Sequence, residues 1–109
     1  MPSEGDIVTV NNMLDPNGKN PKPRPAVIVS ESNDSCIVVA ISSRLDIATN
    51  ETHVMLPWES GGHPKTGLNR KSAAVCFWHE EVCEDRIVAT KSNHRVSKQH
   101  LDAIIQRMT

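Results

Sequence analysis

The fold is decided by two β-branched runs, Ala26-Val27-Ile28-Val29-Ser30 and Cys36-Ile37-Val38-Val39-Ala40-Ile41. The polar stretch between them, residues 31–35, is rich in Ser, Asn and Asp, which favour turns. Both runs are almost continuously apolar, as expected of strands that are buried on both faces. We therefore expect an antiparallel hairpin at the centre of a sheet.

Shorter strand patterns lie on either side of this hairpin, at residues 7–10, 52–56, 72–78 and 86–89. Two segments rich in proline and glycine, 11–24 and 57–67, separate them and predict long exposed loops. A loop of about 14 residues without structure of its own is usually functional or mobile. No repeat or linker divides the chain, so all strands are expected to share one core.

A helical pattern occurs only at the C-terminus. Ser97 is a suitable N-cap, and Val96 and Leu101 stand at the positions of a hydrophobic staple. Helical spacing places four apolar residues on one face, namely Leu101, Ile104, Ile105 and Met108. The sequence therefore predicts one domain over residues 1–109, mainly β with a C-terminal helix, in which the helix packs against a small, strongly bent antiparallel barrel.

The composition limits the modes of binding. Lys and Arg number 12 against 13 Asp and Glu, giving a net charge of -1, so the molecule as a whole has no basic footprint for nucleic acid. The aromatic residues are Trp58, Phe77 and Trp78, and there is no tyrosine. These rings are too few for a platform that stacks several bases in succession.

Several enzyme classes lack their usual motifs in this sequence. There is no glycine-rich phosphate loop, HExxH, GxSxG or paired CxxC. Neither a membrane span nor a signal peptide is predicted, and we expect a cytoplasmic protein. The cysteines, Cys36, Cys76 and Cys83, lie in apolar stretches and are interpreted as reduced, buried thiols, with Cys76-x-x-His79-x-x-x-Cys83 as a weak alternative zinc pattern.

The most informative pair of residues is Arg24 and Ser42. Arg24 precedes Pro25, which holds it extended at the start of a strand, and a guanidinium there can chelate a phosphate. Ser42 and Ser43 end the other strand of the hairpin, so Arg24 and Ser42 are expected to face each other. On spacing alone, the simpler interpretation is a surface charge and two serines that end a strand.

At this point the sequence resembles the PemK/MazF family of toxin endoribonucleases from bacterial toxin–antitoxin modules. The resemblance runs through nearly the whole chain. The matching segments, in order, are Gly5-Asp6-Ile7-Val8, Asp15-Pro16 with Gly18, Arg24 to Ser30, Val39-Ala40-Ile41-Ser42, and Thr66-Gly67-Leu68 through Ser72 to Asp85-Arg86-Ile87.

The resemblance implies a homodimer of SH3-like barrels of the PemK/MazF/CcdB type, neutralised by a cognate antitoxin. It implies an enzyme that cuts single-stranded mRNA at a short sequence without a metal or other cofactor. The family's catalytic arginine and threonine fall on Arg24 and Ser42, so a serine replaces the threonine here. The 2′-OH of the RNA then attacks the adjacent phosphorus, leaving a 2′,3′-cyclic phosphate and a 5′-OH.

Basic and polar groups in the two loops are candidates for RNA contact. They are Lys19, Lys22, Ser43, Trp58, His53, His63, Lys65, Arg70 and Lys71. Trp58 can stack one base or pack its loop onto a partner subunit. Phe77-Trp78 stands where the family often has an acidic residue followed by glutamine, and the acidic run Glu80 to Asp85 is expected to form a solvated turn.

Two alternatives remain open at this stage. One is a noncatalytic member of the same fold, which binds only the antitoxin or inhibits a protein target such as gyrase. The other is a zinc-stabilised barrel built on the cysteine and histidine pattern at residues 76–83.

Overall fold

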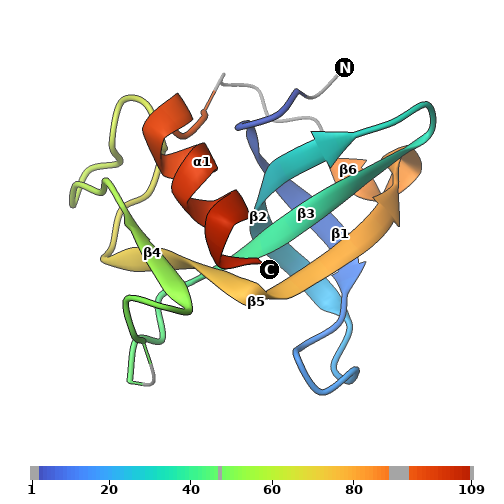
Figure 1. Ribbon diagram of the computed structural model, residues 1–109, viewed down its shortest axis with the longest axis horizontal. Helices are drawn as coiled ribbons and strands as arrows, with labels where there is room; N and C mark the ends of the chain where they lie inside the picture. Colours follow the sequence, from blue (N-terminus) through green and yellow to red (C-terminus); the bar gives the residue numbers. More distant parts are fainter. Residues whose placement is uncertain (1–2, 47, 89–93, 109) are drawn as a thin grey trace.

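The computed structural model describes residues 3–46, 48–88 and 94–108. It shows a strongly bent six-stranded antiparallel sheet with one helix packed across it (Figure 1). The elements are β1 (Ile7–Met13), β2 (Lys22–Glu31), β3 (Ser35–Ser42), β4 (His53–Leu56), β5 (Ser72–Cys83), the 3-10 turn η1 (Glu84–Arg86), β6 (Ile87–Val88) and α1 (Lys98–Arg107).

The predicted hairpin forms the centre of the sheet. The strand order is β4-β5-β3-β2-β1-β6, with β2 and β3 in the middle. In their register Ala26 pairs with Ala40 and Val27 with Val39. The mainly β fold with a C-terminal helix is thus confirmed, although the barrel-like sheet does not close, because β4 and β6 remain its edges.

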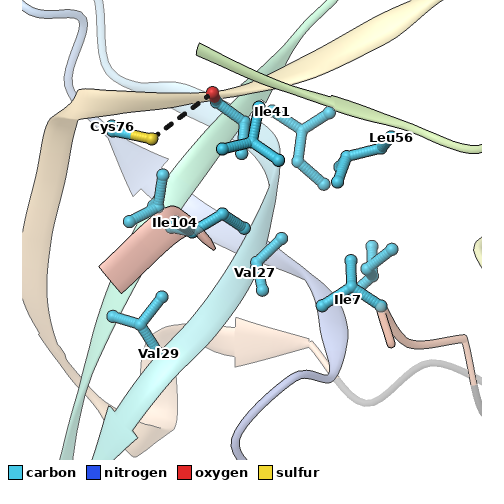
Figure 2. Close-up of a cluster of buried hydrophobic side chains, with 11 residues drawn as sticks. Ile7, Val27, Val29, Ile41, Leu56, Cys76 and Ile104 are labelled. Atoms are coloured by element: carbon cyan, nitrogen blue, oxygen red, sulfur yellow. Dashed lines mark hydrogen bonds between the residues drawn. The ribbon is translucent and has the colours of Figure 1, made fainter. Parts of the chain in front are cut away.

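Both faces of the central hairpin are buried, which explains its continuous apolar sequence. On one face, Val27 and Val39 join a cluster with Ile104 of α1. Figure 2 shows this cluster, with side chains from five strands and the helix pointing together, and the Cys76 thiol donating to the carbonyl of Ala74. On the other face, Ala26 and Ala40 pack in a second cluster that the bent sheet folds around.

The helix begins as predicted but presents a slightly different face. The Ser97 hydroxyl oxygen accepts a hydrogen bond from the backbone N–H of His100 at 3.2 Å. Ile104 is fully buried, whereas Ile105 is 42% exposed, so its predicted place on the packed face is wrong. Ala103 packs against the core instead, because each step along a helix turns the side chain by about 100°.

The first predicted loop is shorter than the sequence suggests. β1 continues to Met13 and β2 begins at Lys22, so only residues 14–21 connect them. β1 continues through the polar residues Asn11 and Asn12 by forming a bulge between Val10 and Met13, in which Asn12 has a φ of 54°. Arg86 fixes this bulge by donating to the carbonyls of Asn11 at 3.1 Å and Asn12 at 2.9 Å.

The end of β5 also differs from the prediction. Glu80 and Glu81 belong to β5, and only Glu84 and Asp85 lie in a turn. The Glu80 carboxylate pairs with Arg86 at 2.9 Å. Cys83 is exposed rather than buried, because it follows Val82, whose side chain takes the inward position at the end of the strand. Residue 89 of the last predicted strand lies outside the described residues.

Candidate functional site

Arg24 and Ser42 lie at one end of the central hairpin. The β2–β3 register pairs Ala26 with Ala40. Continuing it by two residues places Arg24 opposite Ser42, on the face of the second core cluster. Both residues line two adjoining hollows of about 620 Å³ and 430 Å³. The two residues that the sequence predicted to face each other therefore share one site.

The Arg24 guanidinium is held in place by three groups. Its Nε donates to the carbonyl of Met13 and its Nη2 to that of Asn20, both at 2.8 Å. Its Cζ lies 5.0 Å from the ring centroid of Trp78, a cation–π distance. Trp78 is itself fixed, because its Nε1 donates to the carbonyl of Leu14 at 2.9 Å. Nη1 has no hydrogen-bond partner among the described residues and can bind an anion.

The β1–β2 loop that supplies these carbonyls is organised by Asp15. Its Oδ1 accepts from the backbone N–H groups of Asn17 and Lys19, each at 2.9 Å. Its Oδ2 accepts from Nδ2 of Asn20 at 2.8 Å. The hydrogen bond from Lys19, then that from Asn20, lowers the pKa of Asp15. The ionised carboxylate thus keeps Asn20 where it contacts Arg24.

Ser42 offers a hydroxyl beside this guanidinium. Its Oγ accepts from the backbone N–H of Arg44 at 3.1 Å, which turns the chain after β3. The hydroxyl proton remains available for donation to a ligand. Arg44 lines both hollows as well and adds a second guanidinium to the site.

His53 lines the hollow of about 620 Å³. It begins β4 and is only 5% exposed. Its Nδ1 lies 2.6 Å from the hydroxyl of Thr52, and Phe77 packs edge-on at 5.9 Å between ring centroids. Burial lowers the pKa of His53, because a charged imidazolium loses hydration there.

Apart from His53, the residues predicted to contact RNA fall into three groups. Lys22, Ser43 and Arg70 line the hollows around Arg24 and Ser42. His63 and Lys65 line a separate hollow of about 1020 Å³ beside the start of α1. That region lies at the other end of the molecule from the β1–β2 loop (Figure 1).

Trp58, Lys19 and Lys71 form the third group and lie on the surface. All three are exposed, with Trp58 at 44%, and none of them lines any of the hollows described here. The stacking and packing interpretations of Trp58 both remain open.

Sequence reasoning misses the roles of Trp78 and Arg44. The β3–β5 register shifts between Val39, which pairs with His79, and Ile41, which pairs with Ala74. The longer β5 segment bulges there and brings Trp78 under Arg24. No periodic pattern signals such a bulge, whereas the position of Arg44 directly after the two serines is a usable signal.

The alternative zinc pattern is not assembled. Cys76 is buried in the cluster beneath α1, while Cys83 is exposed at the far end of β5. Seven residues of strand place the Cα atoms of these cysteines up to roughly 23 Å apart. Within the described ranges, no three His, Cys, Asp or Glu side chains cluster as metal ligands do. Nor does any described helix have the length and apolarity needed to cross a membrane.

Comparison with known proteins agrees with the fold. The fold is similar to that in a crystal structure of MazE-MazF (Form-II) from Deinococcus radiodurans, with a TM-score of 0.65 and 15% sequence identity, covering 98% of this chain and 90% of that chain. A search of curated proteins finds no significant match. The family model of the PemK-like, MazF-like toxin of type II toxin–antitoxin systems matches residues 3–109.

The chain therefore belongs to the PemK-like, MazF-like toxins of type II toxin–antitoxin systems. The match covers all the described elements, from β1 to α1.

Proposed function

We propose that this toxin is a metal-independent endoribonuclease that cleaves single-stranded mRNA at a short sequence. In this reaction the 2′-oxygen bonds to the adjacent phosphorus and the bond from phosphorus to the 5′-oxygen breaks. The products are a 2′,3′-cyclic phosphate and a 5′-OH. The protein has to stabilise the extra negative charge at phosphorus and assist the movement of one proton.

The observation that carries this proposal is the fixed Arg24 guanidinium in two adjoining hollows that Ser42 also lines. Two carbonyls and the Trp78 ring hold the guanidinium, and Nη1 is left without a hydrogen-bond partner among the described residues. A preorganised cation stabilises a developing charge without the cost of reorienting during the reaction. Ser42 donates its hydroxyl to a second phosphoryl oxygen, as the threonine is expected to do in the family.

The surrounding residues suit a short RNA segment. Lys22, Arg44 and Arg70 supply cations for flanking phosphates, and Ser43 adds a hydroxyl. Few aromatic rings are present, so recognition rests on hydrogen bonds and phosphate contacts. From the family, we further propose that the toxin works as a cytoplasmic homodimer and is neutralised by a cognate antitoxin.

The test is cleavage of a mixed single-stranded RNA pool by purified protein in EDTA. We expect fragments that end in a 2′,3′-cyclic phosphate. Arg24→Ala should lower kcat by about 10²–10³-fold, the effect of removing one charge-stabilising donor. Ser42→Ala should also lower kcat, while Ser42→Thr keeps the hydroxyl and the activity.

The matched control is Lys98→Ala, which removes one positive charge beside the separate hollow at α1. This variant should cleave like the wild type. A requirement for a divalent metal would contradict the mechanism. Growth arrest with intact RNA, unchanged by Arg24→Ala, would instead favour the noncatalytic alternative, a toxin that blocks a protein target.

A further inference from the structure

The proposed reaction requires a group that removes the proton from the 2′-OH, and the pair Arg24 and Ser42 does not supply one. A guanidinium stays protonated in proteins, and a serine hydroxyl is too weak a base. Two carboxylates line the hollow of about 620 Å³. Asp46 is exposed to solvent, and Asp15 already accepts three hydrogen bonds that hold its loop. That carboxylate is a structural acceptor and a poor base.

His53 lies on the same face of the sheet as Ser42. Ser42 pairs with Ala73 of β5, and His53 pairs with Val75 of the same strand. Paired residues, and residues two apart on a strand, point to one face, so Ser42 and His53 both face the hollow. They are two strand spacings apart across the sheet and two residues apart along β5, so their Cα atoms lie about 12 Å apart. The two side chains, together with a ribose and its phosphate, can bridge this gap.

The imidazole is oriented by a short chain of hydroxyl groups. Nδ1 lies 2.6 Å from Thr52 Oγ1, which lies 2.8 Å from Thr49 Oγ1. The Thr52 backbone N–H also donates to Thr49 Oγ1 at 3.2 Å. In the described part of the chain, no buried side-chain nitrogen or oxygen lacks a hydrogen-bond partner. Nε2 has no partner among those residues, so it reaches the solvent of the hollow.

We propose that His53 is the general base of the cleavage reaction, an inference that rests on the proposed endoribonuclease function. Nε2 accepts the proton of the 2′-OH as the 2′-oxygen bonds to phosphorus. The 5′-oxygen leaves with the electrons of its bond to phosphorus and takes a proton from water. The imidazolium then returns its proton to solvent. In the required tautomer, Nδ1–H donates to Thr52 Oγ1, whose own proton goes to Thr49 Oγ1.

The surroundings keep His53 neutral and ready to accept a proton. Burial is the cause that lowers its pKa below the ordinary value. The same hollow is also lined by charged groups of both signs. Asp15, Lys22 and Arg24 come from the β1–β2 side, and Arg44 and Asp46 come from the segment after β3. β5 contributes the uncharged Val75, Phe77 and Trp78, and Arg107 of α1 bonds to the Asn50 carbonyl on the opposite face.

The test is the pH profile of kcat/KM for RNA cleavage in wild-type and His53→Gln proteins. A base must be unprotonated, so the wild-type rate should rise with pH through the pKa of His53, below about 6.5, and then level off. His53→Gln should lose about 10²–10⁴-fold in rate and lack this acidic limb. The matched control is His79→Gln, an exposed histidine on β5 away from the hollows, whose profile should follow the wild type.

A second variant covers the case in which His53→Gln fails to fold. Thr52→Val removes the partner of Nδ1 and should lower the rate and shift the acidic limb to lower pH, because the imidazole becomes less basic. Nitrogen NMR of the wild type should show Nδ1–H and a bare Nε2.

The outcomes separate this inference from the function on which it rests. Cleavage by wild type with an unchanged pH profile in His53→Gln would overturn the role of His53 and leave the endoribonuclease intact. An Nε2–H tautomer would overturn it as well. No cleavage of any RNA by the wild type would reject the proposed function, and the general base with it.

Discussion

The Arg24 guanidinium is held in a half-buried position because several groups contact it. The carbonyls of Met13 and Asn20 accept its N–H groups, and the Trp78 ring lies under its plane. Trp78 is tied to the same loop through its bond to Leu14. One aromatic residue therefore joins the strand bulge of β5 to the loop that holds the guanidinium.

The first prediction concerns Trp78. Trp78→Leu removes both the ring face and the Nε1–H donor, and should lower the free energy of unfolding by about 2–4 kcal/mol. It should also reduce cleavage, since Arg24 loses its support. Trp78→Phe keeps a ring and should cost about 1 kcal/mol for the lost hydrogen bond. Urea unfolding measures both, with the exposed Trp58→Phe as the matched control. Equal effects of the Leu and Phe variants on cleavage would contradict a role for the ring.

At the scale of elements, the β1–β2 loop is ordered in a way that its sequence does not predict. Its prolines, Asn and Gly predict a long exposed loop, of the kind that is usually functional or mobile. The structure closes it around the Asp15 carboxylate and uses left-handed residues at Gly18, with a φ of 76°, and at Asn20, with a φ of 56°. The loop thus becomes a fixed support for Arg24.

The second prediction follows from the lowered pKa of Asp15. A carboxylate whose pKa is lower in the folded state contributes stability above its unfolded pKa of about 3.9, and loses it as the pH falls through the folded value. The urea midpoint of the wild type should therefore fall between pH 5 and pH 2. Asp15→Asn should be less stable at pH 7 and show a shallower fall.

The control for this prediction is Asp85→Asn, which removes the same charge from the exposed turn after β5. It should keep the wild-type slope in the acid range. Identical slopes for the wild type and Asp15→Asn would contradict the role assigned to this carboxylate.

The elements show what the sequence can and cannot predict. The β2–β3 hairpin follows from its β-branched residues, and Arg24 facing Ser42 follows from the hairpin. The bulge in β1 at Asn12 and the bulge in β5 near Trp78 depend on pairing between segments distant in the chain. The same holds for His53, whose place in the site is decided by the β4–β5 register. Local patterns carry no information about these registers.

At the scale of the whole molecule, a net charge of -1 conceals an uneven distribution. Lys22, Arg24, Arg44 and Arg70 gather around the two hollows, while Glu80, Glu81, Glu84 and Asp85 lie along the end of β5 and the following turn. Attraction of the proposed RNA substrate is therefore expected to be local, and total charge underestimates it.

The third prediction tests this local attraction through salt. Binding of a 2′-deoxy oligonucleotide, which lacks the attacking hydroxyl, should weaken linearly in log-log plots as salt rises. Arg70→Ala should weaken binding of all sequences similarly and reduce the slope by about 0.7–1, as expected for one lost phosphate contact. Fluorescence anisotropy of a labelled oligonucleotide measures both, with Lys98→Ala as the control. An unchanged slope would place Arg70 outside the RNA contact.

The contact between Arg24 and Trp78 gives this protein an optical reporter of its own. The chain has two tryptophans and no tyrosine, so in a Trp58→Phe background all indole emission comes from the ring beneath the guanidinium. A phosphate that draws Arg24 away from that ring changes the polarity around the indole and the quenching of its fluorescence. Entry of the proposed RNA substrate and binding of the proposed antitoxin can then be followed in real time, without a label, from the position where the chemistry is proposed to occur.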